Sequence, residues 1–279
     1  MTERLPLSTL RTRFVEQHEP LTKEWEERLR LDTRKGAQAI LRTIEKRRQQ
    51  NRAEGQRLRK MLMHERAWWD DGFTHVAGVD EAGMSPLAGP IVASAVILPH
   101  DARWRGVDDS KKLSPDRRDI LAEHIKKSAI AWATGSVTPE EIDRLNVYHA
   151  GLLAMRRAVL QLSPTPDALL VDARTVPNVD WPQEPLIKGD ARSLSIAAAS
   201  IIAKTTRDKL MVEMDSTYPG YGFAKHKGYP VAGHKAALTR LGPTPIHRKS
   251  FAAVRELLTP QLALALEHDI RSSDPKITT

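Results

Sequence analysis

The sequence contains no cysteine and no long hydrophobic run. The absence of cysteine excludes disulfide bonds, thiolate metal sites and cysteine nucleophiles, so any metal ion must be held by oxygen or imidazole ligands. No stretch approaches the roughly 20 apolar residues that a membrane-spanning helix needs, and the N-terminal residues lack the apolar segment of a secretory signal. We therefore expect a soluble, cytoplasmic protein that does not contact a membrane.

Positive charge is in excess. The 279 residues include 43 Lys and Arg against 35 Asp and Glu, which gives a formal net charge of +8. Such a surface attracts polyanions in a salt-dependent way, and nucleic acid is the natural candidate. The length suits one large domain, or one domain with a helical appendage.

The chain divides into two regions that differ in composition and in hydrophobic pattern. From about residue 21 to 69 it is polar and almost free of Gly and Pro, with apolar residues at helical spacing, which predicts two or three helices. This segment is rich in Arg and Lys. These side chains could form a helix face that binds nucleic-acid phosphates, or a face exposed to solvent, which is the commoner role of charge runs. From residue 75 onward, short β-branched and aliphatic runs alternate with helical patterns.

The second part of the chain predicts a mixed α/β sheet, because three strands precede a long helix and alternation follows. The expected strands are 75–79, 91–98, 129–137, 168–171 and 185–187, and the expected helices are 115–127, 139–162, 194–214 and 231–241. We expect three regions: a helical N-terminal extension at 1–72, a mixed α/β domain at 73–258, and a C-terminal helix with a frayed tail at 259–279.

Four acidic residues lie at the ends of predicted strands. Asp80 and Glu81 follow one apolar run and precede a Gly/Pro-rich turn, and Asp172 and Asp190 each close a later run. If the strands ending at Asp80 and Asp172 are parallel neighbours, their ends lie about 4.8 Å apart. Carboxylates that close repel one another unless a cation neutralises them, and their oxygens suit Mg²⁺ or Mn²⁺.

Each acid has a simpler alternative when it is taken alone. Asp80 and Glu81 could be a solvated pair in a loop, Asp172 could cap a turn, and Asp190 could cap the helix that follows. Taken together, four strand-end acids in a basic, cysteine-free chain favour two-metal hydrolysis of a phosphodiester.

A series of motifs occurs in a fixed order from about residue 75 to 251. They occupy residues 79–83, 86–90, 109–113, 170–172, 188–190, 197–204, 207–208 and 221–229. This series resembles ribonuclease HII, and the N-terminal helical region resembles the extension that longer members of that family carry. The resemblance implies an RNase H-like fold, with a five-stranded mixed sheet flanked by helices and a small helical region before it.

The resemblance also implies the catalytic residues. Asp80, Glu81, Asp172 and Asp190 would form the catalytic quartet that binds Mg²⁺ or Mn²⁺. Asp208 is not a member of this quartet; we expect it to pair with a basic neighbour one helical turn away, such as Lys204.

The activity implied is that of a metal-dependent endonuclease. It would hydrolyse the RNA strand of RNA/DNA hybrids and incise 5′ of ribonucleotides embedded in duplex DNA, leaving 5′-phosphate and 3′-hydroxyl ends. We expect a monomer. The nucleic-acid-binding residues that the resemblance indicates are Gly83, Met84, Ser85, Ser110, Lys111, Lys112, Lys188, Lys204 and Tyr229.

Several other basic residues and histidines carry weaker expectations. Arg207, Lys225 and Lys227 are expected to add positive charge against the duplex without reading its sequence. His226, His234 and His247 are given no catalytic role, because surface or core histidines are commoner than proton shuttles.

One motif departs from the family. This chain has Gly83-Met84-Ser85 where the family has a Gly-Arg-Gly turn that reads the 2′-hydroxyl, the group that distinguishes RNA from DNA. A possible bidentate phosphate contact is lost, and Ser85 is disfavoured if its backbone needs positive φ. We predict retained hydrolysis of hybrids. Two alternatives stay open: a nucleic-acid-binding protein without catalysis, and a structure-selective metal nuclease without ribonucleotide specificity.

Overall fold

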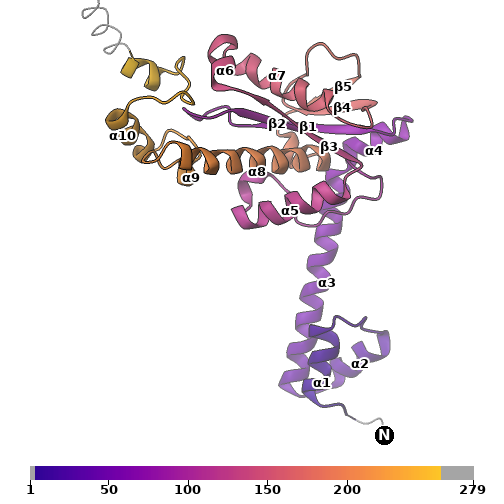
Figure 1. Cartoon of the computed structure of the whole chain (residues 1–279). Helices are drawn as coiled ribbons and strands as arrows, with labels where there is room; N and C mark the ends of the chain where they lie inside the picture. Colours follow the sequence, from indigo (N-terminus) through magenta and orange to yellow (C-terminus); the bar gives the residue numbers. More distant parts are fainter. Residues whose placement is uncertain (1–3, 259–279) are drawn as a thin grey trace, which may run out of the picture. The chain divides into compact units, whose positions relative to one another are not determined.

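A five-stranded mixed sheet organises the C-terminal part of the chain (Figure 1). The structure, a computed structural model, describes residues 4–258, so the predicted C-terminal helix and frayed tail at 259–279 lie outside the described residues. The strands are β1 (Val76–Ala82), β2 (Ile91–Ile97), β3 (Ala131–Val137), β4 (Ala168–Asp172) and β5 (Gln183–Leu186). Their order in the sheet is β3-β2-β1-β4-β5. All five predicted strands are confirmed.

The register of the sheet brings the predicted acidic ends together. β1 pairs antiparallel with β2 and parallel with β4, and Val79 lies opposite Val171. Asp80 and Asp172 are the next residues on these two neighbouring strands. The condition on which the shared metal site was inferred, that their strands are adjacent and parallel, is therefore met.

Helices cover both faces of this sheet. In Figure 1, α7 (Val147–Leu160) lies on one face, while α8 (Leu194–Thr217) and α5 (Pro115–Ser128) lie on the other. Ala77 and Val79 of β1 pack with buried residues of α7 in the main core. On the opposite face Gly78 permits very close contact, because a Cβ there would lie only 2.1 Å from the Ser195 carbonyl carbon. The start of α8 is thus pressed against β1 beside Asp80.

The predicted helix at 139–162 is in fact two helices, α6 (Pro139–Leu145) and α7. Thr138 and Glu141 form a capping box at the start of α6. Asn146 then takes φ 68°, which ends α6, and its side chain accepts a hydrogen bond from the backbone N–H of His149 to begin α7. The other predicted helices of this region correspond to α5, α8 and α10 (Ala232–Leu241), whereas the short α9 (Phe223–His226) was not predicted.

The N-terminal helices form a compact unit that spans Met1–Lys60. Its elements are α1 (Leu7–Arg11), a π-helical turn (Thr12–Glu16), α2 (Lys23–Leu31) and most of α3 (Lys35–Met61). The predicted helical segment at 21–69 is preceded by two further helical elements, whose Leu10 and Phe14 join the core of this unit. Several of its basic side chains bind partners within the unit: Arg48, for example, pairs with Glu26 at 2.6 Å.

The second compact unit begins at Met61 and includes α4 (Met63–Asp70). Glu65 of α4 is fully buried and accepts hydrogen bonds from Ser193 Oγ at 2.7 Å and from Ser195 N and Oγ at 2.8 Å. These groups lie at the N-terminus of α8, where backbone N–H groups otherwise lack partners. Within residues 4–258, no helix is long and apolar enough to cross a membrane.

Candidate active site

Asp80 is buried where β1 faces α8. Its Oδ1 accepts a hydrogen bond from the backbone N–H of Glu81 at 2.7 Å. Burial, together with the charges of Glu81 and Asp172, raises the pKa of Asp80 well above its ordinary value, and a hydrogen bond from the Ser200 hydroxyl only partly opposes this. A carboxylate held under such repulsion is stabilised by an added cation.

Glu81 points to the opposite side of the strand, because successive side chains alternate across a sheet. Its Oε1 lies 3.9 Å from Arg174 Nη1, and its Oε2 is buried without a hydrogen-bond partner. Burial and the nearby Asp172 raise the pKa of Glu81, against the opposing charge of Arg174. The unpartnered oxygen is an acceptor that the protein itself does not satisfy.

Asp172 and Asp190 are joined through a short 3₁₀ turn (Gly189–Ala191) that follows β5. The Gly189 N–H donates to Asp172 Oδ1 at 2.7 Å. Burial, Asp109 and Asp172 raise the pKa of Asp190, while Lys111, whose Nζ lies 4.0 Å from Asp190 Oδ2, opposes the rise. The alternative that Asp190 caps the next helix is wrong, because Ser193 is the N-cap of α8.

The donor set suits a divalent cation. No three His, Asp or Glu side chains within the described part of the chain already form a metal-binding cluster. However, Asp80, Glu81 and Asp190 all have raised pKa values to which Asp172 contributes, and one Glu81 oxygen is buried and unpartnered. Oxygen donors that repel one another and lack other partners fit Mg²⁺ or Mn²⁺.

Two buried arginines shape the turn after β1. Arg207 donates from its guanidinium to the carbonyls of Pro90, Lys227 and Ala88 at 2.9–3.0 Å. Arg248 donates to the carbonyls of Gly83, Met84 and Gly89 at 2.6–3.1 Å. Both are fully buried, so the expectation that Arg207 faces the duplex was wrong. Sequence reasoning missed Arg248, since no local pattern distinguishes a buried arginine from an exposed one.

The Gly83-Met84-Ser85 turn accommodates its unusual residues. Gly83 has φ +99°, and a Cβ there would lie 2.3 Å from Arg207 Nε, so glycine is required at this position. Met84 and Ser85 are outside the residues with positive φ. Ser85 therefore has no backbone strain from a positive φ, and the residue is exposed.

The predicted basic loop divides into a buried and an exposed part. The Ser110 hydroxyl is buried and lies 2.9 Å from the Ser200 hydroxyl, which also hydrogen-bonds Asp80. Lys111 and Lys112 are exposed, as is Lys188 beside Asp190. The lysines, rather than Ser110, are therefore placed to contact a polyanion.

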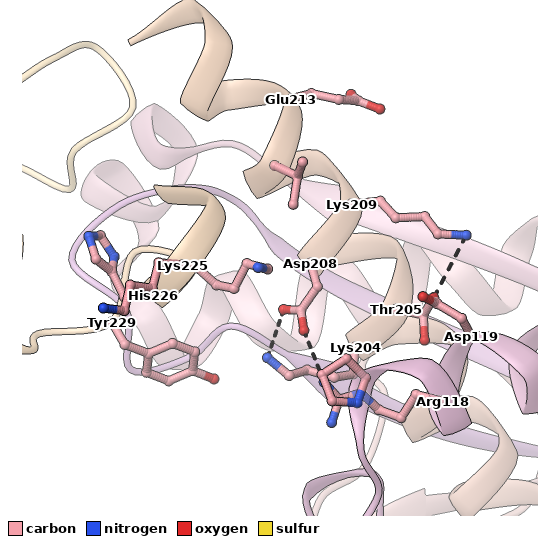
Figure 2. A pocket seen from close by; sticks show the side chains of 13 residues that line it. Arg118, Asp119, Lys204, Thr205, Asp208, Lys209, Glu213, Lys225, His226 and Tyr229 are labelled. Carbon is pink, nitrogen blue, oxygen red and sulfur yellow. Dashed lines mark hydrogen bonds and ion pairs between the residues drawn. The ribbon is translucent and has the colours of Figure 1, made fainter. Parts of the chain in front are cut away.

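A cavity of about 630 Å³ lies beside Tyr229 and contains several basic groups (Figure 2). Lys204 Nζ is 2.7 Å from Asp208 Oδ1, which confirms the predicted pairing of these residues. Asp208 also pairs with Arg118 at 3.4 Å, so it holds two cations on this wall. The same Lys204 nitrogen lies 5.3 Å from the centre of the half-buried Tyr229 ring, a cation–π contact that fixes the ring.

A histidine network supports the segment that carries Tyr229. The Thr244 N–H donates to His247 Nδ1, so the His247 proton is on Nε2 and points to His234 Nε2 at 3.1 Å. His234 in turn donates from Nδ1 to the Tyr229 carbonyl at 2.9 Å. Both histidines are buried, as the core alternative predicted. A further proton on either ring would face a donor instead of an acceptor.

We expect this network to make stability fall below about pH 6.5. Burial, with repulsion from His234, lowers the pKa of His247 to about 4, and burial also lowers the pKa of His234. The neutral rings therefore contribute stability above pH 6.5 that is lost as pH falls toward about 4. Chemical denaturation at pH 8, 6 and 5 should show a smaller loss for His247→Gln than for the unaltered protein. Equal losses would contradict this assignment.

Comparisons with known proteins point to one family for both parts of the chain. The sequence model of the family Ribonuclease HII matches residues 77–254, and that of the Ribonuclease HII N-terminal domain matches residues 8–69. Ribonuclease HII of Myxococcus xanthus (strain DK1622) is 60% identical over 90% of this chain and 86% of its own length. Ribonuclease HII of Geobacillus thermodenitrificans (strain NG80-2) is 52% identical over 84% of this chain and 90% of its own length.

A solved structure shows the same fold. The ribonuclease H2 from Pyrococcus horikoshii OT3 superposes with a TM-score of 0.55 at 28% identity, over 65% of this chain and 96% of that one. The family match covers more than half of the chain, and both curated relatives align over most of their length. The chain therefore belongs to the ribonuclease HII family of endoribonucleases.

Proposed function

We propose that this protein is a Mg²⁺- or Mn²⁺-dependent enzyme that cuts the RNA strand of RNA/DNA hybrids at the phosphate 5′ to a ribonucleotide. The products would carry 5′-phosphate and 3′-hydroxyl ends. The observation that carries the proposal is the placement of Asp80 and Asp172 after paired positions on two parallel strands. Glu81 and Asp190 lie close enough to Asp172 for its charge to raise their pKa values.

The chemistry follows from these four acids and the cations around them. Asp80, Glu81, Asp172 and Asp190 would hold the divalent ions. Bound divalent ions activate water and stabilise the charge of the leaving oxygen in phosphodiester hydrolysis.

Basic and aromatic side chains would bind and orient the substrate. Lys111 and Lys188 are exposed near Asp190 and would bind backbone phosphates without reading sequence. Tyr229, fixed by Lys204, would lie against the ribose, and the backbone of Gly83–Ser85 would meet its 2′-hydroxyl.

The test is a cleavage assay on three labelled duplexes: DNA, an RNA/DNA hybrid, and DNA with one ribonucleotide. Each is incubated with Mg²⁺, with Mn²⁺, or with a chelator. The proposal expects cleavage of the hybrid only when a divalent ion is present. Binding of the hybrid without cleavage would favour a non-catalytic protein, and cutting of plain DNA would favour a structure-selective nuclease.

The altered turn leads to a separate prediction about single ribonucleotides. We expect the double variant Met84→Arg, Ser85→Gly to incise duplex DNA with one ribonucleotide faster than the unaltered protein, by up to about tenfold, because one charge-assisted phosphate contact is added. Its rate on the continuous hybrid should change less, since that substrate offers many equivalent sites. Equal rates on the single ribonucleotide would show that backbone groups alone read the 2′-hydroxyl.

A further inference from the structure

Arg174 lies beside the proposed catalytic residues, and its pairing with Glu81 at 3.9 Å is too long to be a hydrogen bond that would fix its position. It follows β4 two residues after Asp172, and the intervening Ala173 adopts φ 55°. A non-glycine residue in this left-handed conformation is strained, and such strain persists where the surrounding structure requires it. The sharp turn at Ala173 brings the Arg174 guanidinium to the side of the sheet that carries Glu81.

Three groups surround the guanidinium. Its Cζ lies 4.9 Å from the centre of the Tyr148 ring on α7, and this ring is half exposed. Met84 of the turn after β1 lies next to the guanidinium at Gly151 of α7. A Cβ on Gly151 would lie 3.0 Å from Met84 Sδ and 3.1 Å from Arg174 Nη1. The third group is Glu81. Because Gly151 has no side chain, Met84 and the Arg174 guanidinium can both lie against it.

The positive charge of Arg174 is only partly compensated. Its Nη1 is buried without a hydrogen-bond partner, and the Glu81 oxygen at 3.9 Å is too distant for a hydrogen bond. Guanidinium groups that are stacked on an aromatic ring and lack a full set of acceptors are suited to bind phosphate oxygens. About a quarter of the Arg174 side chain is exposed, and because Nη1 is buried, a ligand would meet the other guanidinium nitrogens.

We propose that Arg174 binds a backbone phosphate of the substrate next to the Gly83–Ser85 turn, with Tyr148 holding the guanidinium in place. The inference rests on the proposed function, because it assumes that nucleic acid crosses this edge of the sheet. Arg174 thereby supplies a guanidinium at a turn whose own side chains, Met84 and Ser85, carry no charge.

The test compares Arg174→Gln, Arg174→Lys and the control Arg156→Gln. Arg156 lies on the same helix as Tyr148 and donates to the Asn178 carbonyl at 3.3 Å, so it matches Arg174 in charge but not in position. Two readouts are needed: the affinity for a fluorescein-labelled RNA/DNA hybrid in a chelator at several salt concentrations, and kcat and KM with Mg²⁺. Thermal denaturation confirms that each variant is folded.

We expect Arg174→Gln to weaken hybrid binding about tenfold and to reduce the slope of log affinity against log salt by about one. KM should rise by a similar factor while kcat changes less than about threefold. Arg174→Lys should keep the salt slope, since it keeps the charge, and Arg156→Gln should keep both affinity and slope.

Three results would overturn the inference. The first is an unchanged salt slope in Arg174→Gln. The second is a loss confined to kcat, which would mean that Arg174 positions Glu81 and does not bind phosphate. The third is an equal loss of affinity in Arg156→Gln. None of these affects the proposed function, which is tested separately by the cleavage assay of the unaltered protein on the three duplexes.

Discussion

Asp80→Asn is expected to lower the cleavage rate of an RNA/DNA hybrid by about a thousandfold while making the protein more stable. The rate falls because the amide carries no charge with which to hold a divalent ion, and the loss corresponds to about 4 kcal/mol of transition-state stabilisation. Stability rises because Asp80 is a buried carboxylate next to Glu81 and Asp172, which the folded protein tolerates at a cost. The gain should be about 1–3 kcal/mol in a chelator.

Asp167→Asn provides a matched control with the opposite expectation. Asp167 precedes β4 and accepts hydrogen bonds from Thr74 N, Thr74 Oγ1 and His75 N at 2.8–3.0 Å. These bonds lower the pKa of Asp167, so its charge stabilises the folded state. This variant should therefore lose stability and keep its activity. An Asp80→Asn protein that unfolds, or that cleaves normally, would remove Asp80 from the catalytic assignment.

Addition of Mn²⁺ gives an independent measurement of the same site. A ligand that binds only the folded state raises the midpoint of thermal unfolding. The midpoint of the unaltered protein should rise more than that of Asp80→Asn, and this readout does not depend on catalysis.

The sequence was most informative where a function depends on neighbouring strands. The apolar runs located the five strands, and the acidic residues at their ends pointed to one site on the condition that β1 and β4 are parallel neighbours, which the sheet meets. The pairing of Lys204 with Asp208 was also predictable, because residues four apart share one face of a helix. The strand positions and the pairing of Lys204 with Asp208 follow from regular periods of the chain, whereas the adjacency of β1 and β4 is visible only in the fold.

Prediction failed where contacts join residues that are distant in sequence. Arg207 was expected to face the duplex and Arg248 was overlooked, yet both are buried among backbone carbonyls of the turn after β1. Only the folded chain shows that these carbonyls accept hydrogen bonds from the two guanidinium groups. Arg174 was also overlooked, because its position depends on the left-handed backbone at Ala173.

The boundary of the N-terminal region leads to the second large prediction. The sequence favoured a boundary near residue 72, and the N-terminal family model ends at residue 69, but the compact unit that holds the sheet begins at Met61. We propose that α4 belongs functionally to the catalytic domain. A chain that starts at Met61 should fold and cleave hybrids, whereas one that starts at Phe73 should not fold.

The reason is the loss of Glu65 and of the tryptophans that follow it. Without α4, the Ser193 and Ser195 donors at the start of α8 lose the Glu65 acceptor, and each lost hydrogen bond costs about 0.5–1.5 kcal/mol even where water replaces it. Trp68 and Trp69 also pack against the core that contains Val76 and Ile196. The sum approaches the whole stability of a typical domain, about 5–15 kcal/mol.

Circular dichroism and thermal unfolding of the two shortened chains test this boundary, and Glu65→Leu in the chain starting at Met61 isolates the contribution of the buried carboxylate. That variant should be less stable than its parent but still folded. The affinity of the Met61 chain for the hybrid at low salt then measures what residues 1–60 add to substrate binding, because phosphate contacts from Arg and Lys strengthen as salt falls. A folded, active chain starting at Phe73 would place the boundary at residue 72. It would also show that Glu65 is dispensable, because other groups would then accept the hydrogen bonds at the start of α8.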